Sequence, residues 1–223
     1  VGVPEYQMTA AVWIRGILAE HHGLPVDAVT YRTGGLHDPG RVEKIHLDLP
    51  PRFRVSPIPA DTTLDAMLVA GEIDALYTAR APRSYRPGGP VRRLFSDPRA
   101  AEREYFRKTG IFPIMHTVVI RREVYEAHRW IARSLFDAFA AAKEAVYPQL
   151  HELTALKVSL PWTVSLAEET VELMGRDFWP YGLAPNATTL ETFLRYSHEQ
   201  GLAKRRLAPT DLFAPETLDA VLV

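Results

Sequence analysis

The first third of the chain alternates between short apolar runs and helical repeats. Val1 to Val3 is a short apolar run and predicts a strand. Thr9 is expected to cap the helix that follows, and Gly23 stands where a left-handed glycine ends such a helix. The apolar side of this helix is formed by Val12, Trp13, Ile14, Ile17 and Leu18.

The alternation continues as far as Tyr77. Residues 30–32 predict a second strand, and 37–59 predict a loop with an edge strand. Thr62 or Thr63 is expected to cap a short helix that ends at Gly71, and 73–77 predict another strand. Strands that alternate with helices indicate a small α/β lobe with parallel pairings.

A single histidine lies in the apolar run GIFPIMHT, residues 110–117. The run is strand-like, and a short apolar strand between two kinds of sequence is typical of a crossing between lobes. A polar residue on such a crossing faces a cleft, which makes His116 a candidate functional residue. The alternative is a histidine satisfied within the core. Helices are expected over 124–146, over 166–174 and from Thr188 or Thr189 to Gln200.

The segment between these two parts is basic. Residues 80–108 hold nine Lys or Arg and three acids, a net charge of +6 in a chain of formal net charge −1. Such a segment is either a solvated face or a field that attracts an anion with more than one charge. Nucleic acid is disfavoured, because aromatic residues are not interleaved as stacking platforms.

The overall composition is that of an ordinary globular protein, with 47% hydrophobic and 24% charged residues among 223. The absence of cysteine removes disulfides and thiolate chemistry and fits a reducing compartment. No signal peptide or membrane span is indicated. The chain opens directly on a strand without an initiator methionine, which predicts a missing N-terminal portion.

Common catalytic signatures are missing. The sequence has no phosphate loop, no GxSxG and no HExxH. Its eight histidines show no pair with ligand spacing on one face, so no metal site is predicted.

Several runs resemble the 4,5-dihydroxyphthalate decarboxylase family along nearly the whole chain. The most specific are FPIMH at 112–116 and DFWPYG at 177–182. The resemblance implies an α/β, two-lobed fold like the type 2 periplasmic-binding proteins, with its second lobe incomplete. The implied lobes are a middle α/β lobe over 1–110, a hinge crossing over 111–120, and a mostly helical part over 121–223.

The resemblance also implies a carboxy-lyase that converts 4,5-dihydroxyphthalate, held in a cleft between lobes, to protocatechuate in phthalate degradation. It implies a cytoplasmic enzyme that needs no cofactor, and it leaves a homo-oligomer and a divalent metal open. The formal net charge of −1 predicts a protein that binds neither nucleic acid nor membrane. Two other interpretations remain. One is a solute-binding protein of the ABC-transporter type for a small carboxylate. The other is a regulatory effector-binding domain, although no DNA-binding helix pair supports it.

With this activity in view, six residues receive roles. His116 would protonate the ring carbon, and Arg80 would grip the carboxylate that stays, since gripping the leaving one would stabilise the ground state. Glu5 would accept a hydrogen bond or a proton from a catechol hydroxyl. The residues assigned to substrate binding are Thr9, Arg32 and Trp162.

Each of three assignments has a structural alternative. Glu5 would be a solvated loop residue, Arg32 a member of a surface ion pair, and Trp162 a core residue.

Overall fold

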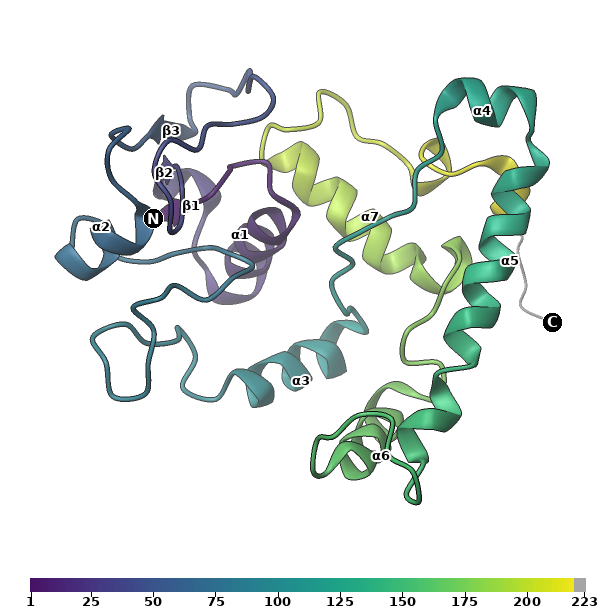
Figure 1. Cartoon of the computed structure of the whole chain (residues 1–223). Helices are drawn as coiled ribbons and strands as arrows, with labels where there is room; N and C mark the ends of the chain where they lie inside the picture. The colour runs from purple at the N-terminus through teal and green to yellow at the C-terminus, as the bar shows by residue number, and fades with distance from the viewer. Residues whose placement is uncertain (219–223) are drawn as a thin grey trace. The chain divides into compact units, whose positions relative to one another are not determined.

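The computed structural model describes residues 1–218 and divides the chain into two compact units. Unit 1 consists of Val1–Pro98 and Thr192–Leu207, and unit 2 of Arg99–Glu191 and the chain from Ala208 on. A small parallel sheet combined with helices confirms the predicted α/β class (Figure 1). The lobe boundaries predicted from the sequence stay a prediction.

Unit 1 is built on a three-stranded parallel sheet of order β1-β2-β3. In the register of the sheet, Gly2 pairs with Arg32 and Thr30 pairs with Arg54. The elements of unit 1 are β1 (Gly2–Val3), α1 (Thr9–His22), η1 (Val26–Ala28), β2 (Thr30–Thr33), β3 (Arg54–Pro57) and α2 (Leu64–Ala70).

The strand predicted over 73–77 is wrong. Only an isolated bridge between Gly2 and Leu76 forms there. Gly2 donates to the carbonyl of Ala75 at 2.8 Å and accepts from the amide of Tyr77 at 2.9 Å. Because β1 is only two residues long, its neighbour finds no further backbone groups to pair with.

Local signals set the ends of the helices in unit 1. Gly23 and Gly71 end α1 and α2 in the left-handed conformation, as predicted. The Thr63 side chain accepts from the amide of Ala66 at the start of α2, which confirms one of the two predicted caps. The predicted cap at Thr9 is wrong, because Thr9 is the first helical residue and Met8 precedes it without a side-chain cap.

The core of unit 1 lies between the sheet and α1. Its buried cluster consists of Val3, Tyr6, Ala11, Leu18, Tyr31 and Tyr77. The end of α7 (Leu183–Glu199) adds a second contact to α1, since the Trp13 ring lies 5.4 Å from Phe193 and 5.8 Å from Tyr196, centroid to centroid. Buried aromatic pairs of this kind join residues 192–207 to the first part of the chain.

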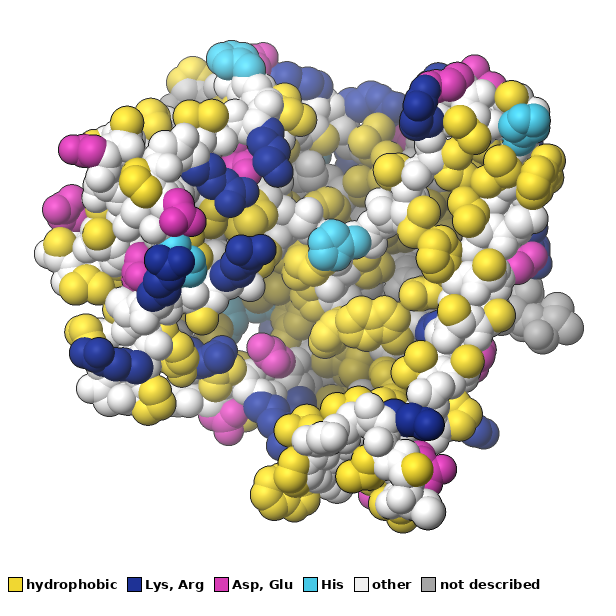
Figure 2. All heavy atoms as spheres, viewed as in Figure 1, with side chains coloured by type: hydrophobic (Ala, Val, Ile, Leu, Met, Phe, Trp, Pro, Cys, Tyr) yellow, Lys and Arg dark blue, Asp and Glu magenta, His cyan; other side chains and the backbone are white. Residues whose placement is uncertain are grey.

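Unit 2 is helical. Its elements are α3 (Pro98–Thr109), α4 (Arg122–Ala127), α5 (Trp130–Glu144), η2 (Tyr147–His151), α6 (Thr163–Met174), the first half of α7, η3 (Pro209–Asp211) and η4 (Pro215–Thr217). The predicted end of α6 at Gly175 is confirmed. Hydrophobic side chains also lie on the outer surface of α5, where Trp130 and Phe139 are exposed (Figure 2).

The single helix predicted over 124–146 is wrong. It is two helices, α4 and α5, separated at His128, whose φ of −143° and ψ of 63° are not helical (Figure 1). The backbone amide of His128 donates to the carbonyl of Val124 at the end of α4. The carbonyl of His128 accepts from the amide of Ile131 at the start of α5. No proline or glycine marks this break in the sequence.

Two further predictions in unit 2 are corrected. Helix α7 begins at Leu183, so Thr188 and Thr189 lie inside it and do not cap it. The side-chain amide of Asn186 donates to the carbonyls of Pro180 and Gly182 at 2.8 and 2.9 Å, which fixes the turn before the helix. The strand predicted over 110–117 is wrong, because these residues form neither helix nor strand.

The aromatic turn at 177–182 is anchored by charge. The buried Lys143 ammonium donates to Asp177 Oδ1 at 2.6 Å, and the Tyr147 hydroxyl donates to the same oxygen at 2.8 Å. Burial acts to lower the pKa of Lys143, but the hydrogen bonds that its ammonium donates to Asp177 and Glu144 raise it overall. The ring of Trp179 also lies 5.4 Å from that of Phe112.

Candidate active site

Glu5 stands in the turn that connects β1 to α1, and its carboxylate is nearly buried. The side chain is 7% exposed. Its Oε1 accepts from Nε of Arg41 at 3.0 Å and also pairs with Nη2 of that arginine, while Lys44 Nζ lies 4.0 Å away. The alternative of a solvated loop residue is therefore wrong.

A second carboxylate occupies the same turn. Glu43 Oε1 accepts from the backbone amide of Tyr6 at 2.5 Å, and its Oε2 accepts from the Gln7 side chain at 3.4 Å. Burial raises the pKa of Glu43, and the negative charge of Glu5 raises it further. A strand-to-helix turn is expected to bind a carboxylate through its free amides, and here the carboxylate belongs to the protein itself.

A buried arginine supports this turn from within unit 1. Arg15, on α1, is 1% exposed and donates to the carbonyl of Tyr6 at 2.6 Å and to Gln200 Oε1 at 2.7 Å. Its guanidinium also lies 3.9 Å from the centroid of the Tyr6 ring. Burial lowers the pKa of Arg15, which stands without a carboxylate partner among residues 1–218.

Sequence reasoning missed Arg15, Arg41 and Glu43. Residues 37–59 were predicted only as a loop with an edge strand, and nothing local in the sequence shows where a loop side chain ends. A charged run around Arg41 and Glu43 follows the Gly34-Gly35 pair, but nothing in the run indicates contact with the turn between β1 and α1.

Thr9 and Arg32 lie in the same unit as Glu5. Thr9 begins α1, at the end of the turn that carries Glu5. Arg32 lies on β2 beside Gly2 and donates from Nη1 to the Ser56 hydroxyl at 2.7 Å. Its side chain forms no ion pair within residues 1–218, so the alternative of a surface ion pair is wrong.

Arg80 follows the core residue Tyr77 and is exposed. Its backbone amide donates to the Thr78 hydroxyl at 3.3 Å. No hydrogen bond or ion pair of its guanidinium is found in the part of the chain that the structure describes. The Arg80 side chain is thus available to an anion from outside.

The basic segment divides between structural and exposed side chains. Arg99 and Arg103 both pair with Glu169 of α6, and the Arg103 contact measures 2.8 Å. These pairs hold α3 against α6 within unit 2. By contrast, several arginines of the segment in unit 1 are exposed, and Figure 2 shows Lys and Arg side chains over that region. They are Arg80, Arg83, Arg86, Arg92 and Arg93.

His116 belongs to unit 2 and lies in the irregular segment after Gly110. Its side chain is exposed, so the alternative of a satisfied core histidine is wrong. An exposed imidazole can exchange its proton with water, which a proton donor needs in order to return to its starting state.

Trp162 precedes α6 and has an unusual backbone. Its φ of 64° is positive, the one such value outside glycine among residues 1–218, and its side chain is 79% exposed. The alternative of a core residue is therefore wrong. A bulky residue in the left-handed region costs roughly 1–2 kcal/mol, and such strain is found most often at functional positions.

Paired substitutions at Trp162 separate this strain from a role of the ring. We expect Trp162→Gly to unfold with a free energy about 1 kcal/mol higher than Trp162→Ala, because only glycine relieves the positive φ. Urea unfolding of both variants measures the difference. If the ring covers a substrate, both variants lose affinity equally. Equal stability of the two would contradict the strained conformation.

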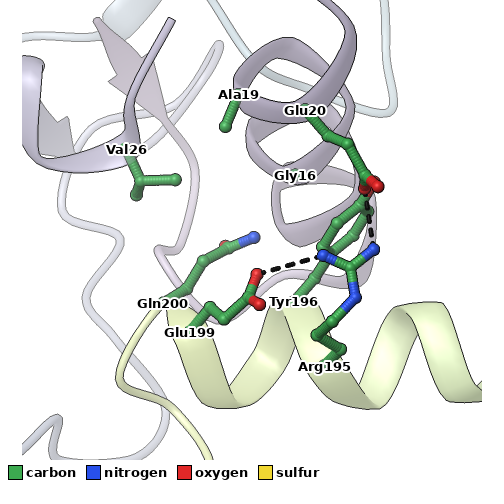
Figure 3. A pocket seen from close by; sticks show the side chains of 8 residues that line it. All are labelled: Gly16, Ala19, Glu20, Val26, Arg195, Tyr196, Glu199 and Gln200. Atoms are coloured by element: carbon green, nitrogen blue, oxygen red, sulfur yellow. Dashed lines mark hydrogen bonds and ion pairs between the residues drawn. The ribbon is translucent and has the colours of Figure 1, made fainter.

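A hollow of about 280 Å³ lies between α1 and the end of α7 (Figure 3). It is lined by Gly16, Ala19, Glu20, Val26, Arg195, Tyr196, Glu199 and Gln200. Arg195 bridges Glu20 at 2.7 Å and Glu199 at 3.4 Å, so the charges in the hollow satisfy one another. None of the six candidate residues is among those that line it, and we regard it as a helix-packing feature.

Two searches of the described residues were negative. No group of three or more His, Asp or Glu side chains in residues 1–218 is arranged to hold a metal ion. No helix in the same range has the length and the apolar composition that crossing a bilayer requires.

The fold is that of a mixed α/β protein. The turn between its first strand and first helix carries one carboxylate, Glu5, and binds a second, Glu43, through a backbone amide. The chain is 40% identical to the 4,5-dihydroxyphthalate decarboxylase of Comamonas testosteroni over 221 residues, which cover 99% of this chain and 67% of that protein. It is 45% identical to the 4,5-dihydroxyphthalate decarboxylase of Pseudomonas putida over 108 residues, or 48% of this chain and 42% of that one. No family model matches the sequence.

The chain therefore belongs to the 4,5-dihydroxyphthalate decarboxylase family, and the resemblance seen in the sequence is confirmed. It spans about two thirds of the length of the Comamonas protein, and its match to the Pseudomonas protein covers less than half of that chain.

Proposed function

We propose that this chain decarboxylates 4,5-dihydroxyphthalate, or a close aromatic dicarboxylate, to protocatechuate as a step of phthalate degradation. The observation that carries the proposal is its 40% identity to the Comamonas decarboxylase along 99% of its length. The exposed arginines of unit 1 add support, because the substrate is a dianion.

In this proposal the substrate is bound through charge and aromatic contact. Arg80 holds the carboxylate that remains, with a planar guanidinium suited to a bidentate bond. Arg32 and the helix start at Thr9 complete the anion cradle, and Trp162 covers the ring face. The Tyr6 amide of the same turn already donates to Glu43, so the cradle is assigned to Arg32 and to the start of α1 at Thr9.

The chemistry requires a base at a hydroxyl and an acid at the ring. A deprotonated hydroxyl pushes its electron pair into the ring, and the carbon that bears the leaving carboxylate takes a proton from His116. The bond to that carboxylate then breaks, carbon dioxide leaves, and the electron pair restores the aromatic ring. We assign the hydroxyl edge to the turn that holds Glu5.

The proposal includes the two-lobed, type 2 periplasmic-binding-protein-like fold and a cytoplasmic location. The parallel sheet of unit 1 supports the first. The sequence contains no cysteine and so no disulfide that a reducing compartment could break, which supports the cytoplasmic location.

A comparison of two ligands tests the proposed function. We expect carbon dioxide from 4,5-dihydroxyphthalate and none from phthalate, which lacks the hydroxyl that supplies electrons. Both reactions are followed with and without a chelator, which reports on a divalent ion. Thermal stabilisation by both ligands, without carbon dioxide from either, would instead indicate a solute-binding protein and overturn the proposal.

Replacement of Arg80 is expected to affect binding more than chemistry. A hydrogen bond to a charged group contributes about 1.5–3 kcal/mol, so Arg80→Ala is expected to raise KM about 10- to 100-fold. The value of kcat changes little, because the retained carboxylate is bound equally in the ground and transition states. Steady-state kinetics measure both values. Arg176→Ala, which also removes an exposed charge, is the control, and an unchanged KM in Arg80→Ala would contradict the assignment.

A further inference from the structure

The loop between β2 and β3 carries three charged residues to the turn between β1 and α1. Arg41 and Lys44 approach Glu5, and Glu43 accepts from the amide of Tyr6, across 36 to 39 positions of sequence. Gly35 allows the loop to turn back, because a Cβ there would lie 1.7 Å from the carbonyl oxygen of Asp38. Two carboxylates with different partners, Glu5 and Glu43, therefore lie at the same turn.

The two carboxylates differ in what neutralises them. Glu5 is nearly buried and its Oε1 is occupied by the Arg41 guanidinium, with the ammonium of Lys44 at 4.0 Å. Glu43 is only partly buried, and its partners are the neutral amides of Tyr6 and Gln7. No ion pair of Glu43 occurs within residues 1–218. A carboxylate already bonded to a guanidinium is a poor proton acceptor, whereas one bonded to neutral donors is a better one.

We infer that Glu43 is the catalytic residue that accepts the proton of a catechol hydroxyl, and that Glu5 and Arg41 are positioning residues that hold the loop in place. This inference rests on the proposed function and deepens it, because it moves the base from Glu5, the residue that the sequence suggested, to a residue of the loop.

The electrostatic surroundings agree with this role. Burial raises the pKa of Glu43 and the charge of Glu5 adds to the rise, while the Tyr6 and Gln7 hydrogen bonds and the Arg15 charge oppose it. The remaining charged groups of the turn, Arg41 and Lys44, lie against Glu5. A general base works best when its pKa approaches the working pH, so a raised carboxyl pKa favours catalysis.

The proton balance of the step is closed. The hydroxyl O–H bond breaks and an O–H bond forms on Glu43, which leaves a phenolate. Its electron pair enters the ring while the ring carbon gains a proton from His116 and loses carbon dioxide. When aromaticity returns, Glu43 gives its proton back to the phenolate oxygen, and His116 takes one proton from the solvent, so both residues are regenerated.

Binding to two ligands tests the inference independently of turnover. Calorimetry in a His116→Ala background, in which turnover is slowed, gives the affinities for 4,5-dihydroxyphthalate and for phthalate, which differ only in the two hydroxyls. We expect this protein, with Glu43 intact, to prefer the hydroxylated ligand about tenfold or more, and the added substitution Glu43→Gln to abolish most of that preference. Glu72→Gln, an exposed carboxylate elsewhere in unit 1, is the matched control and keeps it. An unchanged preference in Glu43→Gln overturns the inference.

Kinetics supply the second readout. General-base catalysis contributes roughly 100- to 10,000-fold, so Glu43→Gln is expected to lower kcat/KM at least 100-fold. Formate, a small carboxylate, is expected to restore part of the turnover of Glu43→Ala, which a purely structural role would not allow. Turnover of Glu43→Gln within threefold of the wild type overturns the inference.

The wild-type protein provides a test that does not depend on any variant folding. Its kcat/KM is expected to fall at acid pH, as Glu43 becomes protonated, with a midpoint shifted upward from the ordinary pKa of a glutamate because burial and the charge of Glu5 raise the pKa of Glu43. A profile without an acid limb overturns the inference. If the wild-type protein forms no product at all, the proposed function fails, while the hydroxyl preference in binding still decides whether Glu43 contacts that edge.

Discussion

His116→Ala is expected to lower kcat about 100-fold or more while the protein remains folded. The proposal assigns the proton of the ring carbon to this imidazole, and a positioned general acid contributes roughly 100- to 10,000-fold. The side chain is exposed, so its removal leaves no cavity and exposes no buried partner. Product formation by chromatography measures the loss, and the thermal midpoint of unfolding shows that the fold persists.

His151→Ala is the matched control, because His151 is also an exposed histidine of unit 2. It is expected to leave kcat unchanged. Loss of affinity in His116→Ala with kcat preserved would assign the histidine to binding and contradict its role as an acid.

Gly16→Ala is expected to destabilise the protein by about 1–3 kcal/mol, although alanine favours helices over glycine by about 1 kcal/mol. An added Cβ would lie 2.1 Å from Cδ2 of Tyr196. The Tyr196 ring cannot swing away, because it is 2% exposed and its hydroxyl donates to Glu20 at 2.5 Å. The overlap therefore outweighs the gain in helix propensity. Urea unfolding measures the change.

A double-mutant cycle isolates the cause. In a Tyr196→Ala background the ring is absent, so Gly16→Ala is expected to be neutral or to stabilise by up to about 1 kcal/mol. Equal destabilisation in both backgrounds would show that the helix pairing of α1 with α7 differs from the one seen here.

The parts of the fold that local chemistry decides could be predicted. Helix α1 ends at Gly23 and α2 begins after Thr63 and ends at Gly71, because caps and left-handed glycines act within one helical turn. The family could also be predicted, because the runs that resemble it, such as FPIMH and DFWPYG, are continuous stretches of the sequence.

The parts that need a distant partner could not be predicted. Apolar runs at 73–77 and 110–117 resemble strands, but a strand forms only where another strand supplies backbone groups, and no local pattern shows that. The break at His128 carries no proline or glycine. The environment of Glu5 was equally hidden, because Arg41 and Glu43 reach its turn from a loop some 36 or 37 residues away.

The most direct test of the proposed decarboxylation is the reaction of the wild-type protein with 4,5-dihydroxyphthalate in heavy water. We expect protocatechuate with one deuterium at a ring carbon, because the carbon that loses carbon dioxide takes its proton from an imidazole in exchange with the solvent. Unchanged substrate that nevertheless raises the melting temperature would contradict it, and would identify a binding protein within a family of decarboxylases.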